Sequence, residues 1–224
     1  MDYRIVIPAR GGSKRLPKKH VLTLGGIPLI VHTIRYAKEF FPNSSIFVNT
    51  DDSEISTISE KEGVQITPRV QGLGEDTTTT LEVLQSQLDW FEEMSITCDA
   101  VILLQATNPL RPRALLTEAI SGFENSNRGS LATFSPLNRK FGKISDNCFV
   151  PENYSPGQRM QDITPSYFEN GLLYITKAET IRNGAVISED VFPFIVNHPY
   201  SHVDIDEKED LIYAEYLLEH YPNL

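Results

Sequence analysis

The sequence has 224 residues, 20 of them Lys or Arg and 30 Asp or Glu, which gives a formal net charge of −10 and a pI near 5.0. That length fits one α/β domain with a substantial core, and the acidic balance argues against a nucleic acid or an anionic membrane as the main partner, because both require an excess of basic residues. Cys98 and Cys148 form no CxxC pair, and the first residues contain no charged leader or long apolar stretch. We therefore expect a cytoplasmic protein.

Short apolar segments alternate with longer segments of helical periodicity. Strands are expected over 4–7, 45–49, 64–67, 100–104, 130–134, 172–176 and 194–196. Helices are expected over 28–40, 52–62, 79–94, 114–124 and 207–220. This alternation is typical of βαβ units, so we predict an α/β fold with a mostly parallel, Rossmann-like sheet and helices on both faces.

One stretch, at about 136–168, interrupts the alternation. It contains four prolines and several aromatic residues but little periodicity. Irregular inserts of this length in a compact domain are commonly functional. We interpret 1–224 as a single domain in which this insert forms a lid or an oligomer arm.

The segment that follows the first strand is rich in basic residues. It reads Ala9-Arg10-Gly11-Gly12-Ser13-Lys14-Arg15-Leu16-Pro17-Lys18-Lys19 and holds a quarter of the Lys and Arg residues of the chain. In open parallel sheets the ligand lies beyond the carboxyl ends of the strands. Backbone amides of Gly11 and Gly12 can approach phosphate oxygens closely, and Arg10 and Lys19 can neutralise a triphosphate. A solvated basic loop is the alternative, but the position after the first strand favours anion binding.

Two carboxylates near the C-terminus are two residues apart. In an extended Val203-Asp204-Ile205-Asp206 segment both would project from one face, with the two apolar side chains packed behind them. Two such ligands, completed by water and phosphate oxygens, are how enzymes usually hold Mg²⁺. Asp206 with Glu209 also matches a helix capping box, so a structural role for Asp206 stays open.

Two other pairs match capping boxes as well. These are Asp51 with Glu54 and Thr79 with Glu82. For Asp51 and its neighbour Asp52 the structural interpretation is favoured. A hydroxyl at a helix N-terminus can also meet a base or a phosphate, so both roles stay open for Thr79.

Polar residues also follow the strand expected over 100–104. Gln105 comes directly after it, where it would contact a substrate or order the loop by hydrogen bonding. Arg111 would bind a carboxylate or hold the loop in place, and we favour the structural role.

Together these motifs resemble those of the acylneuraminate cytidylyltransferases, the CMP-sialic acid synthetases. The first loop of that family reads ARxxSKGxPxKN, and here Arg15 replaces its Gly and His20 its Asn. An arginine at the former position also occurs in sister enzymes that activate Kdo or pseudaminic acid. The other segments that carry the resemblance are Thr50-Asp51-Asp52, Asp76-Thr77-Thr78-Thr79-Thr80, Gln105-Ala106-Thr107-Asn108-Pro109-Leu110-Arg111, Asn170-Gly171-Leu172-Leu173-Tyr174 and Val203-Asp204-Ile205-Asp206.

The resemblance implies a nucleotidyltransferase that transfers CMP from CTP to the anomeric hydroxyl of a nine-carbon 2-keto sugar acid and releases pyrophosphate. The acid would be N-acetylneuraminate or a relative such as legionaminate. The cofactor implied is Mg²⁺ on Asp204 and Asp206, and the catalytic residues are Arg10, Lys19 and Asp206. The nucleotide-binding residues implied are Arg10, Gly11, Gly12, Ser13, Lys19, His20, Arg69 and Thr79, and the sugar-binding residues are Gln105, Thr107, Arg159 and Asn170. The resemblance also implies a homodimer whose insert completes the sugar site of the neighbour.

Three other functions stay open. The first is the sister activity on Kdo or pseudaminate. The second is a nucleotide-sugar glycosyltransferase, which also uses two nearby Asp residues for a metal, although that motif usually follows a strand in mid-chain. The third is a non-catalytic nucleotide-binding module, which would have no need to keep Arg10, Lys19, Asp204 and Asp206 together.

Overall fold

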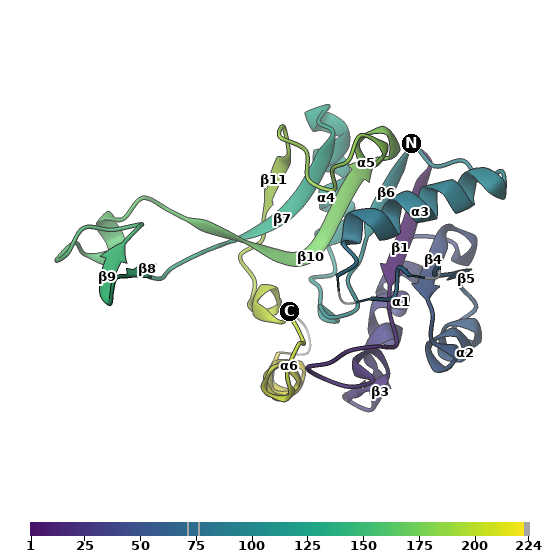
Figure 1. Cartoon of the computed structure of the whole chain (residues 1–224), viewed down its shortest axis with the longest axis horizontal. Coiled ribbons are helices and arrows are strands. Elements are labelled where there is room, and N and C mark those ends of the chain that lie inside the picture. The colour runs from purple at the N-terminus through teal and green to yellow at the C-terminus, as the bar shows by residue number, and fades with distance from the viewer. Residues whose placement is uncertain (71, 76, 222–224) are drawn as a thin grey trace.

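A seven-stranded sheet lies at the centre of the computed structural model, which describes residues 1–70, 72–75 and 77–221 (Figure 1). Its strands are β1 (Tyr3–Pro8), β4 (Ile46–Thr50), β5 (Gln65–Pro68), β6 (Ala100–Leu103), β7 (Ser130–Pro136), β10 (Tyr167–Lys177) and β11 (Phe192–Ile195). The order is β11-β7-β10-β6-β1-β4-β5, and only the two pairings that involve β10 are antiparallel. The predicted α/β class with a mostly parallel sheet is confirmed, and each expected strand is present.

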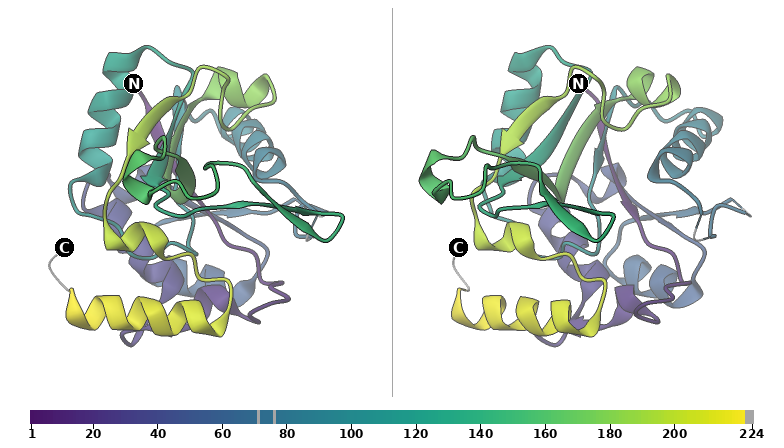
Figure 2. Two further views of the ribbon diagram at one scale, coloured as in Figure 1. Left: turned by 90° about the vertical axis from the view of Figure 1, so that its left-hand side faces the viewer. Right: turned by 60° about the vertical axis from the view of Figure 1, so that its left-hand side comes forward.

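Helices cover both faces of the sheet because successive strand residues point to opposite sides (Figure 2). On β1, Ile5 and Ile7 pack with one set of helices and Val6 packs with the other. The first set is α1 (Leu29–Lys38), α2 (Ser53–Lys61) and α4 (Leu115–Ser126), and the second is α3 (Thr80–Glu93) and α5 (Ala178–Arg182). In the part of the chain that is described, no helix is long and apolar enough to cross a membrane.

The C-terminal helix α6 (Lys208–His220) lies beyond the carboxyl ends of the strands (Figure 1). It packs in a third apolar cluster that includes Leu24, Leu29, Ile205 and Leu217. This cluster joins the loop after β1 to the segment before α6. Residues near Leu24 and near Ile205, far apart in the sequence, therefore meet beyond the carboxyl edge of the sheet.

Some short elements were not expected from the sequence. They are the hairpins β2 (Thr23–Leu24) with β3 (Ile27–Pro28) and β8 (Gly142–Ser145) with β9 (Cys148–Pro151), the helix α5, and the 3-10 helices η1 (Lys19–Val21), η2 (Asn43–Ser45), η3 (Met160–Asp162) and η4 (Pro199–His202). Each has five residues or fewer, too few to display a period. β10 also begins earlier than expected and takes in the last residues of the predicted insert.

The rest of the insert, residues 137–166, projects from the body as an arm (Figure 1). Its hairpin, β8 with β9, carries apolar side chains that are exposed to solvent, namely those of Ile144, Phe149 and Val150. A two-stranded hairpin cannot cover these apolar side chains by itself.

Candidate active site

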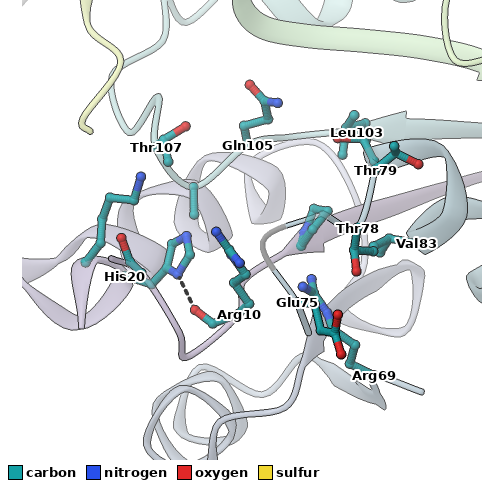
Figure 3. Close-up of a pocket in the computed structure, with 15 residues that line it drawn as sticks. Arg10, His20, Arg69, Glu75, Thr78, Thr79, Val83, Leu103, Gln105 and Thr107 are labelled. Carbon is teal, nitrogen blue, oxygen red and sulfur yellow. Dashed lines mark hydrogen bonds between the residues drawn. The ribbon is translucent and has the colours of Figure 1, made fainter. Parts of the chain in front are cut away.

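Loops after β1, β5 and β6 meet the start of α3 at the carboxyl edge of the sheet, where ligands bind in folds of this class. They enclose a cavity of about 190 Å³, called the first cavity below (Figure 3). It is lined by Pro8, Arg10, Ser13, Lys19, His20, Arg69, Glu75, Thr78, Thr79, Thr80, Val83, Leu103, Gln105, Ala106 and Thr107. Eight of these residues are among the site residues that the resemblance implies, so segments far apart in the chain do converge here.

The glycines of the first loop lie beside α2. The amide of Gly11 donates to Asp51 Oδ1 at 2.9 Å, and a Cβ on Gly11 would lie 2.5 Å from Asp52 Oδ2, so a larger residue would displace the side chain of Asp52. Gly12 lines an adjoining hollow together with Arg10 and Ser13. The expected capping role of Asp51 is wrong: Asp52 caps α2, accepting from the amides of residues 54 and 55, which leaves Asp51 to hold the loop.

Asp206 is held by the basic loop. Lys19 Nζ lies 2.6 Å from its Oδ1, and Arg15 Nη2 lies 2.5 Å from its Oδ2. Burial alone would raise the pKa of Asp206, but Lys19 and Arg15 outweigh it and lower that pKa. The expected capping box of Asp206 is wrong, because α6 begins one residue later and is capped by Glu207 with Asp210. The carboxylate of Asp206 therefore faces the first loop.

Asp204 lies beside the loop that follows β6. The segment alternates as expected, with Val203 and Ile205 buried and the two carboxylates not buried. Ile205 N donates to Thr107 O at 2.8 Å, which ties the segment to that loop. Although Asp204 is exposed at one side, desolvation by the surrounding chain raises its pKa; a hydrogen bond from Thr107 opposes this rise, and the nearby charge of Asp206 adds to it. The charge of Asp206 thus contributes less to the pKa of Asp204 than desolvation does.

His20 forms one wall of the first cavity and is only 7% exposed. Its Nδ1 lies 3.0 Å from the carbonyl oxygen of Arg10 (Figure 3). Because a carbonyl only accepts, Nδ1 carries the proton and Nε2 is an acceptor. Burial lowers the pKa of His20 to about 4, and the charge of Lys19 contributes to the shift. The imidazole is therefore neutral near neutral pH.

Arg69 and Thr79 stand on the side of the cavity opposite His20 (Figure 3). Arg69 donates from Nε to Asn49 Oδ1 at 2.9 Å, and burial lowers its pKa. Thr79 is the N-cap of α3 and forms the expected capping box with Glu82, which is confirmed. Asp76, which belongs to the same sequence motif, lies outside the described residues.

A second cavity adjoins the first and shares Gln105 with it. It is lined by Gln105, Phe168, Glu169, Asn170, Gly171, Tyr174, Ser201, His202 and Asp204. Gly171 has φ +73°, and a Cβ there would lie 2.8 Å from Gln105 Oε1, so this glycine makes room for the glutamine. Tyr174 donates to Glu169 Oε1 at 2.5 Å, while burial and that carboxylate raise the pKa of Tyr174.

Asn170 lies at this second cavity, but its side chain is engaged by the protein. Its Oδ1 accepts from Thr133 Oγ1 at 2.6 Å and from the amide of Leu172, and its Nδ2 donates to Ser135 Oγ at 2.9 Å. Asn170 therefore joins β10 to β7, and its side-chain hydrogen-bonding groups face the sheet.

Arg111 has the structural role favoured from the sequence. Its guanidinium is buried and donates to Leu172 O at 2.8 Å and to Gln105 O at 2.7 Å. Burial lowers its pKa to about 10, so it stays charged at neutral pH. By holding the carbonyl of Gln105, Arg111 fixes the residue that separates the two cavities.

Arg159 is on the arm and lines neither cavity of its own chain. Its Nε pairs with Asp162 at 2.7 Å, and its side chain is 72% exposed.

Sequence reasoning missed most of the second cavity. Phe168, Glu169 and Tyr174 come from β10, whereas Ser201 and His202 come from η4. The Asn170–Tyr174 motif pointed to this strand, but no spacing in the sequence links it to residues 201 and 202. Arg15 was noted as a departure from the family pattern, but its contact with Asp206 could not be read from that pattern.

Comparisons with known proteins agree with this architecture. A family model described as cytidylyltransferase matches residues 4–220. An N-acylneuraminate cytidylyltransferase from Streptococcus agalactiae is 31% identical over 93% of this chain and 51% of its own length, so the chain spans about half of that relative. A CMP-N,N'-diacetyllegionaminic acid synthase from Legionella pneumophila is 32% identical over 98% of this chain and 97% of its own.

A similar fold is found among solved structures. The structure of a CMP:2-keto-3-deoxy-manno-octonic acid synthetase complexed with CTP matches with a TM-score of 0.68 and 16% identity, and the match covers 97% of this chain and 98% of the other. At this level of identity the likeness concerns the fold.

Proposed function

The chain belongs to the cytidylyltransferase family, and we propose that it transfers CMP from CTP to the anomeric hydroxyl of a nine-carbon 2-keto sugar acid, such as N-acetylneuraminate or legionaminate, and releases pyrophosphate. The observation that carries this proposal is the pair of adjoining cavities, one lined by Arg10, Lys19 and Arg69 and the other beside Asp204. The named relatives support a sugar acid as the acceptor. Kdo and pseudaminate remain the alternative acceptors.

The first cavity suits the nucleotide. Its cations can neutralise a triphosphate, and Gly12 and Ser13 in the adjoining hollow can approach phosphate oxygens. Arg69 and Thr79, on the opposite side, would contact the base and ribose. In this arrangement Arg10 and Lys19 stabilise the charge that develops on the leaving pyrophosphate, because transfer at phosphorus depends mainly on positioning and charge neutralisation.

Cytidylyltransferases of this kind generally use a divalent metal, and Asp204 with Asp206 are the residues that would hold it. Their donor set fits Mg²⁺, since hard carboxylate oxygens leave room for water and phosphate oxygens. Asp206 lies close enough to add to the rise in the pKa of Asp204, behind the larger effect of desolvation, and this proximity supports a shared cation. Among the residues described, no group of three or more His, Cys, Asp or Glu side chains could hold a metal alone, so the substrate would complete the coordination. The bound metal would supply charge stabilisation at the phosphates.

The second cavity suits the sugar acid. Gln105 separates it from the nucleotide, and Thr107 lies on the same loop, so the attacking hydroxyl would meet the α-phosphorus between them. Within the described part of the chain, no Lys or Arg lines this cavity. An anionic acid therefore needs a cation from elsewhere.

The arm offers such a cation. Arg159 is exposed on it, and a guanidinium fits a carboxylate bidentately. We infer a homodimer in which the arm of one subunit brings Arg159 to the second cavity of its partner. The exposed apolar side chains of β8 and β9 would be buried in the same contact. Sedimentation that finds only monomers at assay concentrations would exclude this arrangement.

We place the protein in the cytoplasm, in keeping with its two unpaired cysteines.

The test is pyrophosphate release from CTP and Mg²⁺ with a panel of N-acetylneuraminic, legionaminic, pseudaminic and Kdo acids. Turnover that requires CTP and one nine-carbon acid is expected. Asp206→Asn should lower it by about 100-fold or more, because it removes one of the two carboxylates proposed to hold the metal, whose charge stabilisation contributes several kcal/mol. Asp89→Asn, an exposed carboxylate paired with Arg182, is the control and should keep full turnover. Transfer from a nucleotide sugar, or nucleotide binding without turnover, would contradict the proposal.

A further inference from the structure

The basic loop neutralises one of the two C-terminal carboxylates and not the other. Asp206 is engaged at both oxygens, by Lys19 at 2.6 Å and by Arg15 at 2.5 Å. Asp204, two residues earlier, makes no salt bridge with any residue that the structure describes. A cation that bridges the two carboxylates must therefore take an oxygen that is already in an ion pair.

The two cations on Asp206 differ in how easily they can leave. The side chain of Lys19 is only 10% exposed, and its backbone carbonyl in η1 accepts a hydrogen bond from Leu22 N at 3.1 Å. The side chain of Arg15 is 65% exposed. An exposed ion pair contributes little to stability, because water and salt screen it. Arg15 is therefore the partner that can be displaced.

We propose that Arg15 is a displaceable counter-ion that competes with the divalent cation for Asp206, so that the free protein binds the metal weakly. The inference rests on the proposed metal role of Asp204 and Asp206. A triphosphate offers the guanidinium another anion, so nucleotide and metal would each strengthen the binding of the other. Such coupling is reciprocal by thermodynamic linkage.

The experiment is a Mn²⁺ titration of the full chain without nucleotide, in which free Mn²⁺ is followed by electron paramagnetic resonance. Arg15→Gln should lower the dissociation constant about two- to five-fold, the effect of removing one exposed ion pair. Lys18→Gln is the matched control, because Lys18 is 68% exposed in the same loop and pairs with Glu54 rather than with Asp206. Equal changes in the two variants, or none in Arg15→Gln, would overturn the inference.

Asp206→Asn separates this inference from the proposed function. If it removes the Mn²⁺ site while Arg15→Gln binds as the wild type does, only the competition by Arg15 is refuted. If it leaves Mn²⁺ binding unchanged, the metal role of Asp206 fails, and the inference fails with it.

Discussion

The two adjoining cavities differ in charge and in burial. Arg10, Lys19 and Arg69 line the first, with Glu75 as the carboxylate among its lining residues, whereas Glu169 and Asp204 line the second. The charged groups also differ in exposure, since Lys19 in the first cavity is 8% exposed, whereas Glu169 and Asp204 in the second belong to the exposed residues. The first cavity is thus preorganised for an anion by its own chain, and the second is not. Substitutions should accordingly have larger effects in the first cavity than in the second.

The largest effect should come from protonation of His20, which should lower the free energy of unfolding as the pH falls. Its native pKa of about 4 lies below its ordinary value of 6.5, so the unfolded chain binds the proton more readily. Stability from the neutral imidazole is complete above pH 6.5 and is lost as the pH falls from 6.5 to 4, by about 3 kcal/mol in total. His20→Asn removes this term, so urea unfolding of the variant should depend less on pH over that interval.

The control for this measurement is His220→Asn, which replaces an exposed histidine at the end of α6. Its pH dependence should follow the wild type. If the pH dependence of His20→Asn also follows that of the wild type, then His20 is protonated in the native state, and water reaches the first cavity more readily than the burial of His20 indicates.

Residues predicted from the sequence lie together at the first cavity because they stand in short motifs directly after expected strands. Arg10 and Lys19 follow β1, and Gln105 and Thr107 follow β6. In a parallel sheet the carboxyl ends of neighbouring strands lie at one edge, so pattern and topology were enough. What the sequence could not supply is the pairing of these residues with one another.

The N-caps of α2 and α6 show what the local sequence could not predict. Asp51 and Asp206 both matched capping boxes, yet in the structure the cap falls one residue later in each case, on Asp52 and Glu207. In each case the residue that matched the box is engaged by a residue distant in sequence, since Asp51 accepts from the amide of Gly11 and Asp206 pairs with Lys19. Such contacts leave no local signal.

A substitution of Gly171, at the boundary between the two cavities, should have an effect of intermediate size on stability and on the KM for the sugar acid. Gly171→Ala places a Cβ 2.8 Å from Gln105 Oε1 at φ +73°, so it should cost about 1 kcal/mol or more of stability. It should also raise the KM for the sugar acid, because the added Cβ would displace Gln105 and also meet Asn108 Oδ1 at 2.9 Å. Gly26→Ala is the matched control, because Gly26 has φ +78° with no atom within 4 Å of the added Cβ. Thermal unfolding should detect a loss in both variants, and steady-state kinetics a raised KM in Gly171→Ala alone; a raised KM in both would show that strain rather than Gln105 is responsible.

The smallest effect should come from Glu169 in the second cavity. Glu169→Gln keeps the acceptor for the Tyr174 hydroxyl but removes a negative charge from the cavity proposed for an anionic substrate. The KM for the sugar acid should fall by about two- to five-fold, since an exposed charge acts through water. The KM for CTP should stay unchanged, because Glu169 does not line the first cavity. A rise in the KM for the acid would mean that Glu169 accepts a hydrogen bond from the substrate, and the acidity of this cavity would then select hydroxyl or amide donors on the sugar instead of opposing its carboxylate.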